Sequence, residues 1–334
     1  MMKHLACLAL ALAACSGDAS NTVYFDAAHH ATAATYFDYP WPSDLRLDAA
    51  GAPDLTGFPN PRNVPILTDL MSIVPARTGF PVMAAGYFRF TAPIPDRTLD
   101  AVMTDGPVYL VDIDPMSPER GTTFPVVAVT LPKDPYVPTN VLAVAPRPGI
   151  VLRAATEYAY VLGKDVAPGF ARPSGLRESD PHFANLWQTL DQIGLPRAQV
   201  LAATVFTTGD EIAAVAARAE AVRQAYHPVI ENVQLVGDAT YDGFCRLSAT
   251  ITMPQFQTGT PPFNDGGTFV IDPATQLPMK QAEMTIPVTI TLPKETMPAT
   301  GWPLYQFFHG SGGLSTGLVD LGQSPTSDDM PEPG

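Results

Sequence analysis

Short apolar segments separated by turn residues constrain the fold of this chain more than any other feature. Residues 86–90, 107–113 and 157–162 alternate between apolar and polar side chains, and residues 124–131 and 141–145 are valine-rich runs between them. Alternation with a period of two predicts strands that bury one face. The 36 prolines in the chain fit this pattern, because proline cannot donate to a strand ladder and collects in turns. Closely spaced strands of this kind predict a β-sandwich.

Two segments have helical spacing instead. Residues 181–193 place apolar side chains three or four positions apart, and residues 211–226 form an alanine-rich run without glycine or proline. Between them, residues 200–206 are apolar except for Thr204 and predict a strand. We therefore expect a first domain over residues 36–226, with its helices near the C-terminal end.

The second part of the chain returns to strands. Residues 244–253 and 282–292 alternate over long stretches, and residues 304–308 form a short aromatic-rich run. The last run is closed by glycine, which is typical of a buried strand in a parallel sheet. We expect these strands to belong to a second domain over residues 227–334.

The N-terminus has the pattern of an export signal. Lys3 precedes a ten-residue apolar run, which is too short to span a bilayer, and the run ends in Leu12-Ala13-Ala14-Cys15. Residues 1–14 with Cys15 resemble a bacterial lipoprotein signal peptide, which implies cleavage before Cys15, lipidation of its thiol and a membrane anchor. Ser16 at the next position implies the outer membrane by the same resemblance. A plain secretory peptide with a coincidental cysteine is the alternative, and residues 15–35 are predicted to be a tether.

Charge and composition exclude several classes of partner. The net charge of −14 argues against nucleic acid, whose phosphates require a basic face. Removal of the signal peptide and lipidation of Cys15 leave Cys245 as the last cysteine, so no intramolecular disulfide is expected. His29 and His30 are adjacent and point in opposite directions in extended chain, so we predict no metal site and no cofactor.

An aromatic- and proline-rich stretch precedes the first strands. Residues 36–62 contain several rings, and residues next to proline favour extended backbone, so we expect an ordered loop. The rings are expected to fill the core of the domain, and a platform for stacking a sugar or another ligand is the alternative.

The strongest chemical signal follows the strand predicted at residues 304–308. Residues 309–313 read His-Gly-Ser-Gly-Gly, and we call this segment the glycine turn. Glycine tolerates dihedral angles that other residues avoid, so backbone N–H groups in such a turn can converge on one point. Converging N–H groups bind a developing negative charge. A tight turn without a ligand is the alternative.

These segments together resemble a known group of proteins. Residues 88–94 and 152–158 resemble strands of bacterial immunoglobulin-like domains, and residues 203–208 resemble the end of the N-terminal β-domain of the virulence-factor-lipase type. The glycine turn resembles the oxyanion-hole element of α/β-hydrolases of the lipase and esterase branch. The implied fold class is β-rich plus α/β: an N-terminal immunoglobulin-like β-sandwich with a helical segment, followed by the first strands of an incomplete α/β-hydrolase fold.

The resemblance also implies roles for individual residues. The amide of Ser311, together with that of Gly312, would bind the oxyanion formed during cleavage of an ester or lipid substrate. His309 would brace the turn, and Gly310 and Gly313 would shape it. Residues 313–317 have the G-x-S-x-G spacing of a nucleophile elbow, with Ser315 at its centre.

The context disfavours Ser315 as the nucleophile. No strand directly precedes residue 313, and no histidine follows Ser315 in the sequence, whereas the family places its histidine last. We therefore expect the nucleophile and the base beyond residue 334, and we expect this chain alone to be inactive. The rival hypothesis is a non-catalytic lipoprotein of the cell envelope that uses an immunoglobulin-like domain for binding or adhesion.

Overall fold

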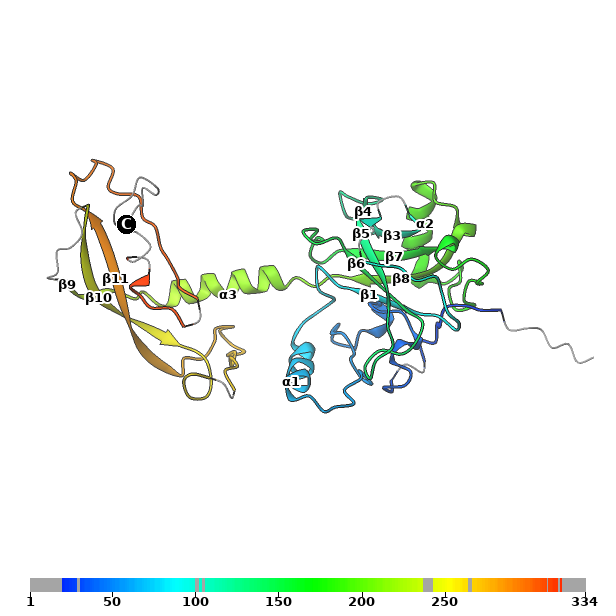
Figure 1. Ribbon diagram of the computed structural model, residues 1–334, viewed down its shortest axis with the longest axis horizontal. Helices are drawn as coiled ribbons and strands as arrows, with labels where there is room; N and C mark the ends of the chain where they lie inside the picture. Colours follow the sequence, from blue (N-terminus) through cyan, green and yellow to red (C-terminus); the bar gives the residue numbers. More distant parts are fainter. Residues whose placement is uncertain are drawn as a thin grey trace, which may run out of the picture. The chain divides into compact units, whose positions relative to one another are not determined.

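The computed structural model describes residues 20–28, 31–99, 102–103, 106–236, 243–263, 266–310, 312–317 and 319. The chain divides into two compact units, Met1–Ile212 and Ala213–Gly334. The division falls at the start of helix α3 (Glu211–Ala225), whereas the predicted domain boundary lies at the end of the same helix. Each unit is described separately below (Figure 1).

The first unit contains two four-stranded antiparallel sheets. One sheet has the order β1-β6-β5-β2 and the other has the order β4-β3-β7-β8. The strands are β1 (Gly86–Arg89), β2 (Val102–Met103), β3 (Val108–Asp112), β4 (Thr123–Phe124), β5 (Val126–Leu131), β6 (Val141–Pro146), β7 (Glu157–Gly163) and β8 (Val200–Thr207). The strands predicted from alternation are confirmed within one or two residues at each end.

One apolar core joins the two sheets. It contains Phe88 and Val144 from the first sheet and Leu110, Tyr160 and Phe206 from the second, all fully or almost fully buried. Side chains of a strand alternate between its two faces, so these residues define the inner face of each sheet. The unit is therefore a β-sandwich.

A helix covers the outer face of the second sheet. Helix α2 (Ala184–Gln192) follows the 3-10 turn Pro181–Phe183, and its side chains Leu186, Trp187 and Leu190 are buried. They pack against Ala159 and Val205, which point away from the inner core. The helix predicted at residues 181–193 is confirmed. Because the second sheet is covered on both faces, seven of the eight residues of β8 are buried.

A side-chain hydrogen bond fixes the corner before β7. The hydroxyl of Tyr158 accepts a hydrogen bond of 3.0 Å from the backbone N–H of Arg153, five residues earlier. Ala155, between them, has a positive φ of 48°, which is uncommon for a residue with a side chain. This tyrosine therefore holds the chain in a tight corner where it enters the second sheet.

Short helical segments complete the first unit. Helix α1 (Pro65–Ile73) begins with proline at its first position and buries none of its side chains. The 3-10 turns are Tyr36–Asp38, Asp44–Arg46, Val74–Ala76, Lys164–Val166 and Arg197–Gln199. Alternation and helical spacing in the sequence did not single out α1.

Part of the segment predicted as a tether is packed into the sandwich. Val23 is buried, forms a β-bridge with Phe90, and its neighbour Thr22 forms another with Ala171. Phe25 packs against the cluster of buried residues around α2. The tether prediction is therefore wrong for residues 22–25, because these apolar side chains add to the core of the sandwich.

The second unit contains an antiparallel sheet of the order β11-β10-β9. Its strands are β9 (Ile230–Leu235), β10 (Phe244–Gln255) and β11 (Ala282–Pro293), and β10 and β11 pair over twelve residues. The long strands predicted at residues 244–253 and 282–292 are confirmed, as is the helix predicted at residues 211–226. In the described residues of this unit, the buried apolar side chains are Ala249 and Val319.

Residues 304–308 do not form the buried strand that the sequence predicts. They have no ladder partner in the structure, and Leu304 and Phe308 are 92% and 80% exposed. A parallel partner requires a crossover connection, usually a helix, and none is present between β11 and residue 304. The described residues therefore do not cover this apolar segment.

Candidate functional site

The glycine turn is closed by local hydrogen bonds. The backbone N–H of Gly313 donates to the carbonyl of Gly310 at 3.0 Å. The Nδ1 atom of His309 lies 2.9 Å from the same carbonyl oxygen, which places the imidazole as a donor through Nδ1. Ser311, the predicted first oxyanion donor, lies outside the described residues. The amide of Gly313 is thus used inside the turn.

Two glycines of the turn face open space. Gly312 has a φ of 79°, and a Cβ atom added at Gly310 or Gly312 would meet no other atom within 4 Å. At Gly313, by contrast, an added Cβ atom would lie 2.8 Å from the Cβ atom of His309. His309 therefore folds against Gly313, in agreement with a bracing role, while the side of Gly310 and Gly312 stays accessible.

Ser315 contacts the sheet rather than a histidine. Its hydroxyl oxygen lies 3.4 Å from Oγ1 of Thr289, which is the donor and belongs to β11. No hydrogen bond between Ser315 and a histidine occurs among the described residues. His182 belongs to the sandwich, His309 bonds within the glycine turn, and His29 and His30 lie outside the description. The described residues do not assemble a catalytic triad.

The aromatic loop fills the core of the first unit. Tyr36, Phe37 and Tyr39 are buried, which confirms core packing and leaves no exposed platform of these three rings. Arg46 is 1% exposed, and its guanidinium carbon lies 4.1 Å from the centre of the Tyr36 ring and 4.9 Å from that of the Trp41 ring. Its Nη1 donates to the carbonyl of Tyr36 at 3.0 Å. Burial lowers the pKa of Arg46, and neighbouring groups partly oppose this change.

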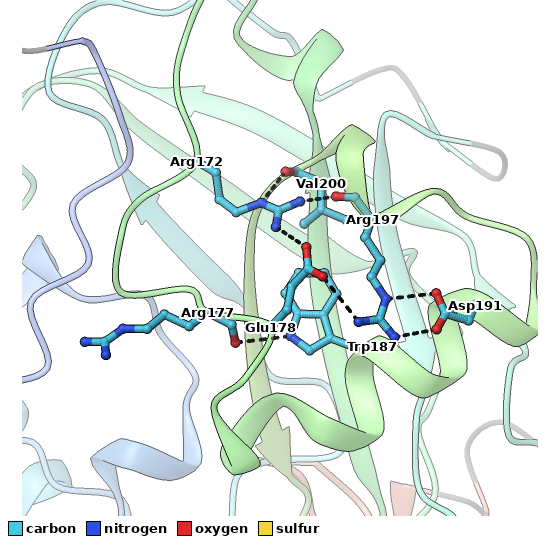
Figure 2. Close-up of polar contacts among 7 residues, drawn as sticks. All are labelled: Arg172, Arg177, Glu178, Trp187, Asp191, Arg197 and Val200. Carbon is cyan, nitrogen blue, oxygen red and sulfur yellow. Dashed lines mark hydrogen bonds and ion pairs between the residues drawn. The ribbon is translucent and has the colours of Figure 1, made fainter.

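A network of charged residues surrounds Trp187 and was not predicted from the sequence. Figure 2 shows Glu178 between Arg172 and Arg197, with Arg197 also paired to Asp191. Arg172 additionally donates to the carbonyl groups of Val200 and Arg197. Its guanidinium carbon lies 5.1 Å from the centre of the Trp187 ring.

The charges in this network are paired with one another. Two arginines meet two carboxylates, and the remaining donors of Arg172 reach backbone carbonyls (Figure 2). The arrangement fastens the segment before α2 to the start of β8, since Arg172 and Val200 belong to these two parts. We interpret it as structural.

A second polar cluster lies at one end of β7 and β8. Asp44 accepts hydrogen bonds from the backbone N–H of Thr207 at 2.7 Å and from its hydroxyl at 2.6 Å. Burial raises the pKa of Asp44, which these two hydrogen bonds partly counteract. Burial lowers the pKa of the nearby His182, and the charges of Asp44 and Asp180 partly oppose the change. Glu157 accepts a hydrogen bond from Asn185 at 2.7 Å in the same region.

Neither metal ligation nor the surface hollows identify another site. Among the described residues, no group of three or more His, Cys, Asp and Glu side chains is arranged to hold a metal ion. A hollow of about 300 Å³ is lined by Pro59, Pro61 and residues 134–138 of the first unit. Two of its polar side chains are used in local turns, because Asn60 accepts a hydrogen bond from the backbone of Val64 and Asp134 accepts one from that of Tyr136.

Comparison with known proteins adds no relative. No family model matches the chain, and no curated protein or solved structure matches it. In the described residues, none of the helices has the length and apolar character required to cross a membrane. The predicted signal peptide and Cys15 lie outside the described residues.

Proposed function

We propose that this chain belongs to an exported, lipid-anchored hydrolase of the serine-hydrolase class that cleaves carboxylic esters, with the glycine turn as its oxyanion hole. The observation that carries the proposal is the open side of the turn, where Gly312 adopts a positive φ and a Cβ atom added at Gly310 or Gly312 would meet none of the described residues within 4 Å. A substrate oxygen can approach the backbone closely there, because no side chain intervenes.

The chemistry assigned to the turn is electrostatic. When a nucleophile attacks an ester carbonyl, the carbonyl oxygen becomes an alkoxide, and the amides of Ser311 and Gly312 would donate to it. One such donor stabilises the transition state by about 3 kcal/mol. The alkoxide then collapses, the alcohol leaves with a proton from the base, and water releases the acid from the acyl-enzyme. The nucleophile and base are assigned to residues outside the described ones.

Two further features support an α/β-hydrolase sheet around the turn. The twelve-residue pairing of β10 with β11 supplies long antiparallel strands before the turn. The hydrogen bond between His309 and the carbonyl of Gly310 supports the bracing role that the family resemblance implies.

The test is hydrolysis of p-nitrophenyl butyrate by the full protein, with labelling by a fluorophosphonate. The variant Gly312→Ala forces a side chain into a positive φ and displaces the amides of the turn, so we expect kcat to fall about 100-fold. Gly301→Ala is the matched control, because Gly301 has a φ of 80° and the same open surroundings but lies outside the turn. Equal activity of both variants would refute the oxyanion assignment.

The alternative is a non-catalytic binding or adhesion lipoprotein, and the sandwich supports it independently. Its orders β1-β6-β5 and β4-β3-β7-β8 correspond to those of immunoglobulin-type sheets, and Tyr158 has the position and hydrogen bond of a tyrosine corner. Absence of both ester hydrolysis and fluorophosphonate labelling in the full protein would favour this function.

The membrane anchor is a separate part of the proposal. Lipidation of Cys15 would attach the protein to the outer membrane, and the acyl chains would supply the affinity. Replacement of Cys15 by alanine should release the protein from the membrane fraction and abolish incorporation of radioactive palmitate. Retention of both in the variant would contradict the lipid anchor.

A further inference from the structure

The segment after the glycine turn is joined to the sheet of the second unit by a side-chain hydrogen bond, and it contains one buried side chain. Val319 is 1% exposed, whereas Leu304, Phe308 and Leu314 are largely exposed. Ser315 is half-buried, and its hydroxyl oxygen accepts a hydrogen bond from the hydroxyl of Thr289. Backbone bonds from Gly317 to Leu314 and from Val319 to Thr316 wind this segment into tight turns.

Thr289 is a firm support for such a contact. It lies in the middle of β11, where it is paired with Ser248 of β10, and ladder pairs continue on both sides. Alternation along β11 places Thr285 and Thr289 on one face, opposite to Ile286, Val288 and Ile290. The hydroxyl of Thr289 therefore connects the sheet to a segment that starts two residues after the glycine turn.

We propose that Ser315, held by Thr289, is a positioning residue that keeps the glycine turn in the orientation required to bind the oxyanion. This inference rests on the proposed ester hydrolase function. Ser315 has the G-x-S-x-G spacing of a nucleophile, but its hydroxyl faces a threonine, and a serine nucleophile requires a base within hydrogen-bond distance. The spacing reflects a short turn that is anchored at its central residue.

Loss of the hydroxyl pair should affect the chemical step more than substrate binding. The oxyanion exists only after attack, so a displaced turn lowers kcat while KM stays nearly constant. The loss of one neutral hydrogen bond predicts a fall of about fivefold in kcat for Thr289→Val and for Ser315→Ala. Since both variants break the same contact, the double variant should be no slower than either single variant.

The experiment measures kcat and KM of the full protein with p-nitrophenyl butyrate and the extent of labelling by a fluorophosphonate. Thr289→Ser and Ser315→Thr keep a hydroxyl and should restore kcat. Thr285→Val is the matched control, because its hydroxyl bonds to Thr252 on the same face of the sheet. It removes a similar hydrogen bond without contacting Ser315.

The outcomes separate this inference from the proposed function. A wild-type protein without hydrolysis and labelling would overturn both. An active wild type whose Ser315→Ala variant loses all labelling would identify Ser315 as the nucleophile and overturn only the positioning role. Unchanged kcat in Thr289→Val, or an equal loss in Thr285→Val, would also overturn it. Complete labelling with a lower kcat, restored by Thr289→Ser, would support it.

Discussion

Strands β8 and β9 show that the two units differ in how far they bury the apolar residues of their strands. In β8, seven of eight residues are buried, because one face meets the other sheet and the opposite face meets α2. In β9 all six residues are exposed, including Ile230, Val233 and Leu235. Both strands are paired with a neighbour in their sheet. Pairing alone therefore does not bury a strand, and a second layer is required.

The same contrast applies to the functional proposals. The charged groups of the network around Trp187 in the first unit are partly exposed but are paired with one another. The glycine turn lies in the second unit, and the apolar residues Leu304, Phe308 and Leu314 on either side of it in the sequence are exposed. The candidate for chemistry thus belongs to the less enclosed of the two units, and the following predictions test that contrast.

The largest difference is expected between two phenylalanines. Phe206 is buried between the sheets and packs against the rings of Tyr158 and Tyr160, so Phe206→Ala should destabilise the sandwich by about 3–5 kcal/mol. Phe308→Ala should change the free energy of unfolding by about 0.5 kcal/mol or less, because the ring is exposed. Urea denaturation followed by circular dichroism measures both values.

The milder variant Phe206→Leu keeps the comparison measurable if Phe206→Ala does not fold, with an expected loss of about 1–2 kcal/mol. A loss for Phe308→Ala as large as that of Phe206→Leu would break the comparison. It would show that residues 304–308 are packed in the full protein, as a hydrolase strand would be.

The sequence predicted the elements that carry a strong period. Alternation located β10 and β11, and the alanine-rich run without glycine or proline located α3. It missed α1, a helix that buries none of its residues and lies between proline-rich segments. It also could not indicate that Arg46 is buried, since enclosure by Tyr36 and Trp41 depends on contacts between separate parts of the loop.

The sequence indicated which residues form the candidate turn, but not which other parts of the chain lie around that turn. Glycine at residues 310, 312 and 313 predicts a turn, and the positive φ of Gly312 and the hydrogen bond from Gly313 to Gly310 agree with a turn, whereas the accessibility of the amides of Ser311 and Gly312 stays a prediction. The burial of residues 304–308 was predicted wrongly, because an apolar run indicates a preference for burial but not the presence of a covering layer. The contact between Thr289 and Ser315 joins residues 26 positions apart and has no sequence signal.

The next effect concerns the tyrosine corner. Tyr158→Phe leaves the N–H of Arg153 without its acceptor, so we expect a loss of about 1–3 kcal/mol in the stability of the sandwich. The matched control in the second unit is Tyr305→Phe, which removes a hydroxyl from an exposed ring and should have almost no effect. Similar stability of the two variants in urea denaturation would contradict the structural role of the corner.

A pH-dependent effect should also be confined to the sandwich. Burial lowers the pKa of His182, so the folded state binds this proton less readily than the unfolded state. Above the usual histidine pKa, His182 is neutral in both states and the full stability is present. As the pH falls through that value toward the lower folded-state pKa, the unfolded state takes up the proton first and stability is lost. The wild type should therefore lose more stability than His182→Asn between about pH 8 and about pH 5.

Buried carboxyl groups in the same region have the opposite effect on stability at low pH. Burial raises the pKa of Asp44 and Glu157, so these groups favour the folded state at low pH, but both proteins retain them. The charge of His182 lowers the pKa of Asp44, so the difference between the two unfolding curves reports His182 together with its interaction with Asp44. Parallel curves over this pH range would show that the histidine is not desolvated in the folded protein.

The smallest effect is expected on the exposed helix α3. Arg223 and Glu220 form an ion pair one turn apart, and no side chain of α3 is buried. Arg223→Gln should therefore reduce stability by only about 0.3 kcal/mol, and added salt should abolish the difference because exposed pairs are screened. A loss of more than about 1 kcal/mol that persists in high salt would mean that this face of α3 is packed against other structure. The contrast between a layered and an uncovered unit would then have to be limited to the strands.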